Sequence, residues 1–297
     1  LIESDYRGKV YPVNPKTTKL LGRRCYRSVL AIRGAVDLAI IIVPARVVPL
    51  VLREAGKKSV PAAVVISSGF KETGSDGKAL EEEIAHIAKQ YRIALLGPNC
   101  LGFLRPKLGL NASFAPRLPH DGSIAFFSQS GALCTALLDL TADDLGFSHF
   151  VSTGNKAVID EKDLLAHFAA DRNTSVLSLY AEDLTDAPRC IALGRALVEN
   201  PLPKPVIALK SGQTESGRSA SSSHTGALAG SDAAYDALFR QARIVRARTL
   251  EHLRDLLLVF SSNPLPTGKR IAIVTNAGGL GVLATDAAIR SGLTLAR

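Results

Sequence analysis

Strand-length apolar runs alternate with helix-length segments along this 297-residue chain, and turn-forming residues follow each run. In the first third of the chain, three strands are expected at residues 37–43, 62–66 and 93–96. Two helices, expected at residues 46–55 and 78–91, separate these strands. A parallel strand pair needs a long crossover connection, which a helix commonly supplies, so this alternation predicts an α/β fold with a parallel sheet.

The same alternation continues in the second part of the chain, where further strands are expected at residues 123–128, 149–152, 176–180 and 205–209. Near the C-terminus, one further unit is expected, with a strand at residues 270–275, a glycine turn at 276–281 and a helix at 282–290. We therefore expect an α/β protein with two consecutive doubly wound parallel-sheet domains and the first βα unit of a third. The expected domains are residues 1–117, 118–262 and 263–297.

The N-terminal domain is expected to lack its first strand. A Rossmann-type domain opens with a strand and a glycine-rich phosphate turn. Residues 1–8 instead have the pattern of a helix end, and Lys9–Val13 has the pattern of the second strand. Together with the absence of methionine, this leads us to expect that the chain is a fragment of a longer polypeptide.

Composition favours a cytoplasmic α/β protein. Hydrophobic residues make up 46% of the chain, yet its longest apolar runs are far shorter than the roughly 20 residues that cross a membrane. No signal peptide is visible in the sequence. The four cysteines are widely spaced and form no Cys-x-x-Cys pair, so neither a metal site nor a disulfide framework is expected. A reducing compartment suits such cysteines.

The net charge of +9 raises the question of nucleic-acid binding. Residues 1–33 hold eight basic residues against two acidic ones, but no stacking aromatics are interleaved with them. We therefore expect no nucleic-acid partner. A polyphosphate ligand suits this basic segment better, because a positive field steers such ligands to their site. A solvated basic face remains an equal alternative for each single residue.

One histidine, His224, lies in a loop of small hydroxyl and glycine residues with the sequence Ser-Ser-Ser-His-Thr-Gly-Ala-Leu-Ala-Gly at positions 221–230. Ser231 is the expected N-cap of the helix that follows. An imidazole in such a loop can carry a phosphoryl group, because helix N-termini and backbone N–H groups stabilise phosphate oxygens. From the residues alone, a surface or packing histidine stays the alternative.

Five short motifs occur in the order found in one enzyme family. They are Val-Tyr-Pro-Val-Asn-Pro-Lys (10–16), Leu-Gly-Pro-Asn-Cys-Leu-Gly (96–102), Phe-Phe-Ser-Gln-Ser-Gly-Ala-Leu (126–133), Thr-Gly-Asn-Lys (153–156) and the His224 loop. Together they resemble the nucleoside-diphosphate-forming acyl-CoA synthetases, which are relatives of succinyl-CoA synthetase. The resemblance implies a Rossmann-like CoA-binding domain followed by a flavodoxin-like domain of the succinyl-CoA synthetase type.

The resemblance also implies an activity. Such an enzyme interconverts acyl-CoA, ADP and phosphate with a free acid, CoA and ATP, through an acyl phosphate and a phosphohistidine. The expected ligands are coenzyme A, an acyl-CoA or carboxylic acid, and Mg-ATP or Mg-ADP bound by an ATP-grasp domain or subunit outside this chain. An oligomer is expected, and no membrane partner.

The expected site residues fall into three groups. The catalytic pair is His224 with Glu182, whose carboxylate would hold one ring N–H; Asp183 is a lower-ranked alternative to Glu182. The strand-end turns expected to bind phosphate contain Ser128, Gln129, Ser130, Gly131, Gly154 and Asn155. The resemblance implies that coenzyme A is held by Lys16, Val43, Pro44, Ser68, Gly69, Phe70 and Asn99.

Two other functions compete with the synthetase. Some bacterial members of the family are fused to a lysine acetyltransferase domain and have lost the histidine, so a CoA-sensing or acyl-CoA-sensing regulatory module is the first alternative. Retention of His224 and Glu182 argues against a full loss of catalysis. A Rossmann oxidoreductase is the second, but no Gly-x-Gly-x-x-Gly with an acidic residue about 20 positions later is present.

Overall fold

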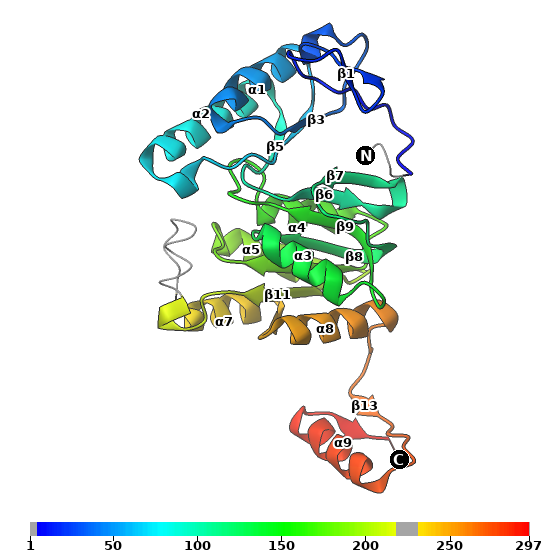
Figure 1. The fold of residues 1–297 in the computed structure, drawn as a ribbon. Coiled ribbons are helices and arrows are strands. Elements are labelled where there is room, and N and C mark those ends of the chain that lie inside the picture. The colour runs from blue at the N-terminus through cyan, green and yellow to red at the C-terminus, as the bar shows by residue number, and fades with distance from the viewer. Residues whose placement is uncertain (1–4, 218–230, 297) are drawn as a thin grey trace. The chain divides into compact units, whose positions relative to one another are not determined.

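The computed structural model describes residues 5–217 and 231–296. The chain divides into two compact units, Leu1–Ser261 and Ser262–Arg297, and each is described by itself. The first unit contains a three-stranded sheet and a seven-stranded sheet, both covered by helices (Figure 1). None of the helices in the described part of the chain combines the length and apolar character needed to span a membrane.

The three-stranded sheet is parallel and has the order β3-β4-β5, formed by Leu38–Ile41, Ala62–Val65 and Ala94–Leu96. Helices α1 (Val48–Lys57) and α2 (Ser75–Tyr91) connect these strands and pack against each other. This arrangement confirms the strand and helix alternation expected for the first third of the chain. Short 3-10 helices lie at Val29–Ala31, Ala45–Val47, Lys71–Thr73 and Pro106–Leu108.

The strand expected at Lys9–Val13 is not formed. Only Val13 makes a bridge, to Tyr26, while β1 (Lys19–Leu20) and β2 (Arg23–Arg24) form a short antiparallel pair. Pro12 explains the difference, because proline has no N–H to donate to a sheet ladder.

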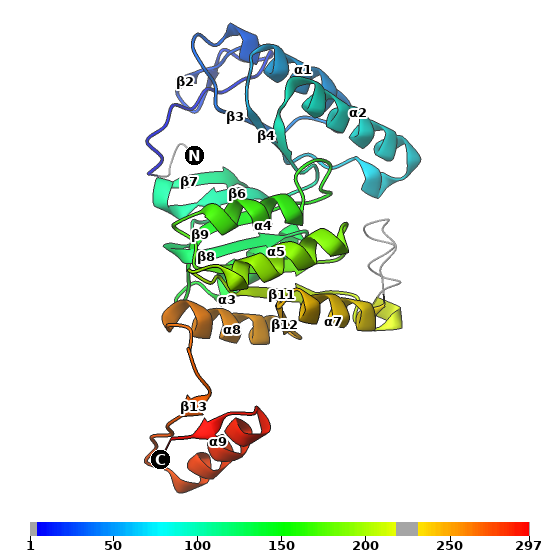
Figure 2. The same cartoon turned by 180° about the vertical axis from the view of Figure 1, so that it is seen from behind.

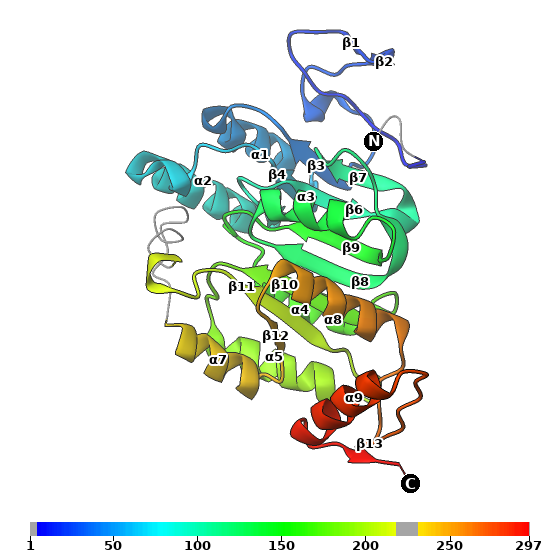
Figure 3. The same ribbon diagram turned by 60° about the horizontal axis from the view of Figure 1, so that its bottom comes forward.

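The seven-stranded sheet has the order β12-β11-β10-β8-β9-β6-β7 (Figure 3). Its five parallel strands are β8 (His120–Ser128), β9 (Gly146–Ser152), β10 (Val176–Ala181), β11 (Val206–Lys210) and β12 (Val245–Ala247). The remaining two, β6 (Gly102–Arg105) and β7 (Leu110–Ser113), form an antiparallel hairpin, and β6 pairs antiparallel with β9. The five parallel strands agree with the parallel sheet expected from the sequence, whereas the antiparallel strands β6 and β7 differ from it.

The β6–β7 hairpin lies on the N-terminal side of the domain boundary that the sequence suggested at residues 117 and 118, yet it belongs to the second sheet. Leu104 of β6 is buried and pairs with Phe150 of β9. The sheet therefore draws strands from both sides of the suggested boundary, because burying these apolar side chains requires contact with β9.

Helices cover both faces of the seven-stranded sheet (Figures 1 and 2). On one face, α3 (Gly131–Leu140) and α8 (Leu250–Ser262) share a core with the sheet. On the other face, the core includes side chains of α4 (Glu161–Ala170), α5 (Ala187–Glu199) and α7 (Asp232–Gln241). Ser231 caps α7 as expected, since its side chain accepts the N–H of Ala234.

The second unit contains one parallel strand pair and one helix. The strands are β13 (Arg270–Ile271) and β14 (Thr294–Leu295), and α9 covers Gly278–Arg290. The expected strand at residues 270–275 is thus shorter, and the helix begins four residues earlier than expected. Its glycines form the first turn of α9 instead of a separate loop.

His149 is a buried residue of β9, and its side chain packs against Phe168 of α4. Its Nδ1 atom is 3.6 Å from an Asp171 carboxylate oxygen, and its ring lies 5.0 Å from that of Phe168. Burial, followed by the positive charge of Arg105, lowers the pKa of His149 to about 4, although Asp171 opposes the shift. The folded protein therefore holds this imidazole neutral at pH values where an exposed one is charged.

We predict that His149 makes the folded state less stable in mild acid. Below pH ~6.5 the unfolded chain binds a proton at this histidine, whereas the folded protein does not until about pH 4, so stability falls as the pH drops through that window. Between pH ~7.5 and ~4.5 this group should remove about 2 kcal/mol. Urea unfolding at both pH values should show His149→Gln losing about 2 kcal/mol less than the wild type. Equal losses in the two proteins would contradict the assignment.

Candidate active site

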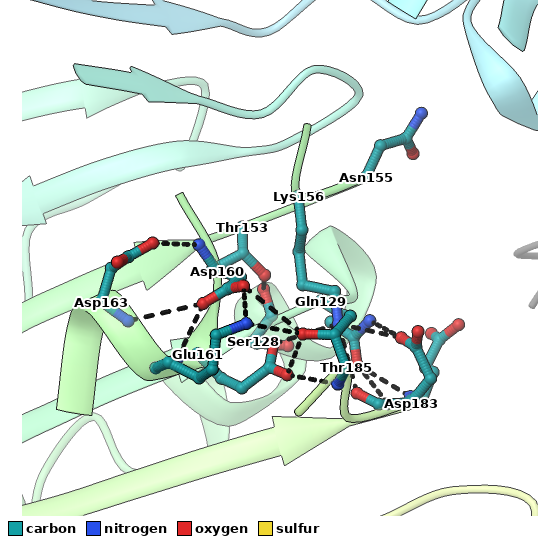
Figure 4. Close-up of polar contacts among 12 residues, drawn as sticks. Ser128, Gln129, Thr153, Asn155, Lys156, Asp160, Glu161, Asp163, Asp183 and Thr185 are labelled. Atoms are coloured by element: carbon teal, nitrogen blue, oxygen red, sulfur yellow. Dashed lines mark hydrogen bonds and ion pairs between the residues drawn. The ribbon is translucent and has the colours of Figure 1, made fainter. Parts of the chain in front are cut away.

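The carboxyl ends of three neighbouring parallel strands meet at one edge of the seven-stranded sheet. Ser128, the last residue of β8, is in register with Ser152 of β9 and with Tyr180 of β10. The turns that follow these strands therefore lie side by side (Figure 4). Ligands of open parallel sheets bind at such strand ends.

The turn between β8 and α3 is held by its own hydroxyl groups. Ser128 Oγ donates a hydrogen bond to the Ser130 carbonyl (2.9 Å) and accepts one from the Ser130 N–H (3.1 Å). Ser130 is the N-cap of α3, and its Oγ accepts the N–H of Leu133 at 3.3 Å. The helix thus begins at Gly131 in a fixed direction, with its positive dipole end at the strand edge.

Gln129 uses its side chain to hold the end of β10. Its Oε1 accepts the N–H groups of Glu182 and Asp183, the latter at 3.1 Å, and its Nε2 donates to the Asp183 carboxylate. The Gln129 N–H donates to the carbonyl of Tyr180 at 3.3 Å. Because protein groups occupy all of these atoms, a direct phosphate contact from Gln129 stays a prediction, whereas its contacts with the β10 end are observed.

Of the two acidic residues after β10, Glu182 is buried and Asp183 is half-buried. Glu182 is 7% exposed. Asp183 Oδ1 lies 2.9 Å from Lys156 Nζ and also accepts a hydrogen bond from Gln129 Nε2. Burial alone would raise the pKa of Asp183, but the Lys156 charge and these hydrogen bonds outweigh burial and lower it. Asp183 is therefore a carboxylate engaged in an ion pair.

His224, the predicted phosphoryl carrier, lies outside the described residues, and so does the rest of its loop at residues 221–230. The described chain stops before that loop at Gly217 and resumes at Ser231. The end of β11 leads toward the loop, and its last residue is the fully buried Lys210. Lys210 Nζ lies 4.5 Å from the centre of the Tyr235 ring of α7.

The loop after β9 connects the two sheets of the first unit. Asn155 Nδ2 donates to Glu72 and to Glu81, each at 2.7 Å, and its carbonyl accepts a hydrogen bond from Lys71. Asn99 Nδ2 donates to Asn155 Oδ1 at 3.3 Å. Two carboxylates thus already surround the Asn155 amide, and its predicted contact with phosphate remains untested.

Gly154 allows this loop to approach the three-stranded sheet. Its φ is +55°, and a Cβ here would lie 2.3 Å from the carbonyl oxygen of Pro98 and 2.5 Å from that of Asn99. Such a close backbone approach requires glycine. Any contact of Gly154 with phosphate stays a prediction.

The three turns that were expected to hold coenzyme A are joined to one another. Ser67, next to the predicted Ser68, donates its hydroxyl to the carbonyl of Val43 at 2.5 Å. Its own carbonyl accepts the N–H of Asn99 at 2.9 Å. Pro44 follows Val43 as the N-cap of the 3-10 helix at Ala45–Val47. The strand ends therefore form one continuous edge of the three-stranded sheet.

The Glu72 carboxylate binds the backbone of the turn after β4. Its carboxylate accepts the N–H groups of Gly69 (2.6 Å) and Phe70 (3.1 Å). Burial would raise the pKa of Glu72, but the hydrogen bonds from Asn155 and these peptide groups lower it. The Phe70 side chain is fully buried. Phe70 can therefore contact a ligand only through its backbone.

Lys16 and the other basic residues near the N-terminus are available to an anionic ligand. Lys16 is exposed, and its Nζ makes no hydrogen bond or ion pair with any described residue. The same segment exposes further cations at Arg7, Lys9, Lys19, Arg23, Arg24, Arg27 and Arg33. Arg24 also lies over the Tyr26 ring, 5.1 Å from its centre. A group of exposed cations suits a polyphosphate such as coenzyme A, because a positive field attracts anionic ligands.

Sequence reasoning missed Lys156 and the carboxylates Glu72, Glu81 and Glu161. Lys156 is the last residue of the Thr-Gly-Asn-Lys motif, so a lysine directly after a strand-end turn was the available signal. The glutamates lie on the 3-10 helix at Lys71–Thr73, on α2 and on α4, and nothing in their local pattern marks them.

Two family models match the chain: a CoA binding domain over residues 2–106 and a succinyl-CoA ligase like flavodoxin domain over residues 121–260. This chain belongs to the NDP-forming acyl-CoA synthetase family of the succinyl-CoA synthetase superfamily. A similar relative is the acetate–CoA ligase (ADP-forming) of Methanocaldococcus jannaschii, which is 48% identical and aligns with 96% of this chain and 40% of its own length.

The acetate–CoA ligase (ADP-forming) I subunit alpha of Pyrococcus furiosus is 44% identical over 99% of this chain and 64% of its own length. A solved acetyl-coenzyme A synthetase 1 of Ca. Korarchaeum cryptofilum, in complex with phosphate and ADP, aligns with a TM-score of 0.92 and 42% identity. That alignment covers 98% of this chain and 62% of the solved chain. The chain thus spans between 40% and 64% of the length of these relatives.

Membership of the acyl-CoA synthetase family confirms the resemblance drawn from the five motifs and the two-domain α/β fold. The regulatory module fused to an acetyltransferase finds no support in these relatives, which are ligases and a synthetase. The oxidoreductase alternative is set aside on the same ground.

We predict that Gly154→Ala destabilises the protein by about 3 kcal/mol or more, because it adds a clash with two carbonyl groups to the cost of a positive φ. Gly34→Ala is the matched control: its φ is +88°, and nothing lies within 4 Å of the Cβ position. This control should lose only about 1 to 2 kcal/mol. Chemical denaturation measures both free energies of unfolding, and equal losses would show that Gly154 is not needed for close approach.

Proposed function

We propose that this chain is the CoA-binding and phosphohistidine-bearing part of an ADP-forming acyl-CoA ligase. One observation carries the proposal: Gln129, in the turn before α3, binds the peptide N–H groups of Glu182 and Asp183. This contact brings an acidic strand end and a helix N-terminus to one edge of the sheet, which is the arrangement that a phosphorylated histidine requires.

The chemistry divides one difficult transfer into three balanced steps. Phosphate attacks the carbonyl carbon of an acyl-CoA, and the C–S bond breaks to give an acyl phosphate and CoA. A ring nitrogen of His224 then attacks phosphorus, which releases the carboxylic acid as its anion. The phosphohistidine finally gives its phosphoryl group to ADP, and ATP and free His224 result. A covalent intermediate on the protein makes each step easier than direct transfer.

Glu182 is the proposed partner of His224. In the family that the motifs resemble, a glutamate at the end of this strand holds the histidine, and Glu182 directly follows β10 at that position. Glu182 would accept one ring N–H of His224 and leave the other nitrogen unprotonated as the nucleophile. Its negative charge also favours the ring that bears a phosphoryl group and an N–H.

The N-terminus of α3 is the proposed phosphate cradle. Ser130 already caps the Leu133 N–H, and the first N–H groups of a helix point outward along its axis. Gly131 is the first residue of α3, and a Cβ here would make only ordinary contacts with Leu101, the nearest at 3.6 Å. A phosphoryl group at this position would interact with the positive end of the helix dipole.

Coenzyme A is proposed to bind at the edge formed by the turns after β3, β4 and β5, with its phosphates near Lys16. The nucleotide, accompanied by magnesium, is proposed to bind to an ATP-grasp domain or subunit that completes the enzyme. Assembly into an oligomer and a cytoplasmic location are also proposed.

We predict that coenzyme A binds this chain and NAD does not, as measured by calorimetric titration. Lys16→Ala should weaken CoA binding about fivefold and reduce its dependence on salt, because a phosphate contact is lost. Lys78→Ala is the matched control, since Lys78 is equally exposed but lies on α2 and makes only a surface ion pair with Glu82. Binding of NAD without CoA would refute the assignment of this edge.

We predict that His224 is phosphorylated during turnover. The enzyme assembled with its ATP-grasp part, incubated with labelled ATP and Mg²⁺, should acquire a label that is lost in acid and stable in base. His224→Asn should abolish the label and acyl-CoA formation. Glu182→Gln should keep the fold but slow labelling roughly 10- to 1,000-fold. A label that persists in His224→Asn, or that is acid-stable and maps to Ser221, Ser222 or Ser223, would refute this mechanism.

A further inference from the structure

Lys156 is a buried cation at the edge of the proposed site. Its side chain is 4% exposed, and its Nζ lies 2.9 Å from Asp183 Oδ1 and 3.1 Å from Glu161 Oε2 (Figure 4). The same ammonium group donates to the carbonyl of Asp183 at 3.2 Å. All three partners of this group are thus protein oxygens, which hold the ammonium group in place.

Glu161, which pairs with Lys156, and Asn155, which precedes it in the chain, each make further hydrogen bonds. Glu161, the first residue of α4, accepts the N–H of Thr185 at 2.8 Å, so it fixes the chain just beyond Asp183. On the other side, Asn155 is bound to Glu72 and Glu81 of the CoA-binding region. Lys156 therefore joins a loop tied to the CoA-binding region with the segment that follows β10.

A continuous set of contacts leads from Lys156 to Glu182. Lys156 holds the carboxylate of Asp183, the same carboxylate accepts Gln129 Nε2, and Gln129 Oε1 accepts the Glu182 N–H. The orientation of the Gln129 amide follows from this pattern, because its N side faces a carboxylate and its O side faces two peptide donors.

We propose that Lys156 is a positioning residue for phosphoryl transfer, which acts through Asp183 and Gln129 to hold the backbone of Glu182 beside the turn that precedes α3. The proposal rests on the proposed phosphohistidine function and adds a residue to it. Lys156 does not touch the reacting atoms in this scheme. Its single positive charge lies between the carboxylates of Asp183 and Glu161 and reduces their mutual repulsion, so that Asp183 stays in place to accept the Gln129 amide.

Loss of this charge has a defined consequence. Without Lys156, Asp183 and Glu161 lie near each other with no shared cation, and Asp183 moves away or takes up a proton. Either change weakens its hydrogen bond to Gln129 and frees the amide to rotate. Glu182 then loses the acceptor that fixes its peptide, and the geometry needed to orient an imidazole is lost.

The test measures His224 phosphorylation from labelled ATP in a single turnover, with the enzyme assembled with its ATP-grasp part. Lys156→Met removes the charge at similar length and should slow labelling about 10- to 100-fold. Calorimetry should find CoA affinity within about twofold of the wild type, because no CoA-binding group is altered. This split separates positioning from general loosening of the fold.

The matched control is Lys204→Met. Lys204 is a half-buried lysine whose Nζ holds the carbonyls of Phe168 and Asp171 at 2.8 and 2.6 Å. It precedes β11, so it lies at the opposite edge of the sheet from the site. Lys204→Met also removes a partly buried ammonium group and its hydrogen bonds, but away from the site, so it should label at the wild-type rate.

Two further variants test the route through Asp183 and Gln129. Asp183→Asn combined with Lys156→Met should label no more slowly than the slower of the two single variants, because both changes act on one contact. Gln129→Met removes the contact with Glu182 without unbalancing a buried charge, and it should also slow labelling at least tenfold. It serves as the decisive variant if Lys156→Met does not fold.

The outcomes separate this proposal from the one on which it rests. A wild-type enzyme that acquires no acid-labile label refutes the phosphohistidine function. A labelled wild type with Lys156→Met and Gln129→Met within twofold of its rate overturns the role of Lys156. Multiplicative effects in the double variant, or an equal loss in Lys204→Met, also overturn it.

Discussion

The hydrogen bonds from the Gln129 side chain to the end of β10 are the constraint on which the rest of the site depends. The Gln129 amide accepts the peptide N–H groups of Glu182 and Asp183. It also donates to the Asp183 carboxylate, which pairs with Lys156. This contact ties the β8–α3 turn to the residues after β10, which are more than 50 positions away in sequence. The N-terminus of α3 and the acidic end of β10 are therefore held at a fixed spacing.

The loop at residues 153–156 connects this edge to the CoA-binding region. Asn155 reaches the carboxylates of Glu72 and Glu81, while Lys156 reaches that of Asp183. Along this path the carboxylates of Glu72 and Glu81 accept the Asn155 amide, and that of Asp183 accepts the Lys156 ammonium group, so each has a hydrogen-bond donor. Mutual pairing offsets the cost of burying these groups, and the two sheets of the first unit are held together by polar contacts as well as by a shared apolar core.

Much of the fold followed from local pattern, and the exceptions have physical causes. The strands at β3, β4, β8, β10 and β11 lie within a few residues of their expected places, since burial on both faces gives a continuous apolar run. Lys9–Val13 has a similar appearance, but Pro12 interrupts its ladder. The β6–β7 hairpin was not expected, because β6 joins the sheet by pairing with β9, which begins more than 30 residues later in the chain. For the site, the sequence pattern predicted where the strand-end turns lie, but it did not predict which contacts their side chains make.

The sequence by itself determined the α/β class, the order of the strand-end turns and the motifs that carry the family, because periodicity and turn chemistry are local properties. Only the tertiary structure decided that Gln129 binds the peptide of Glu182, that Asn155 faces two carboxylates and that Lys156 pairs with Asp183. These contacts join residues 27 to 83 positions apart. Their partners are selected by burial, where each charge must find an opposite charge or a donor, and that condition exists only once the strands have come together.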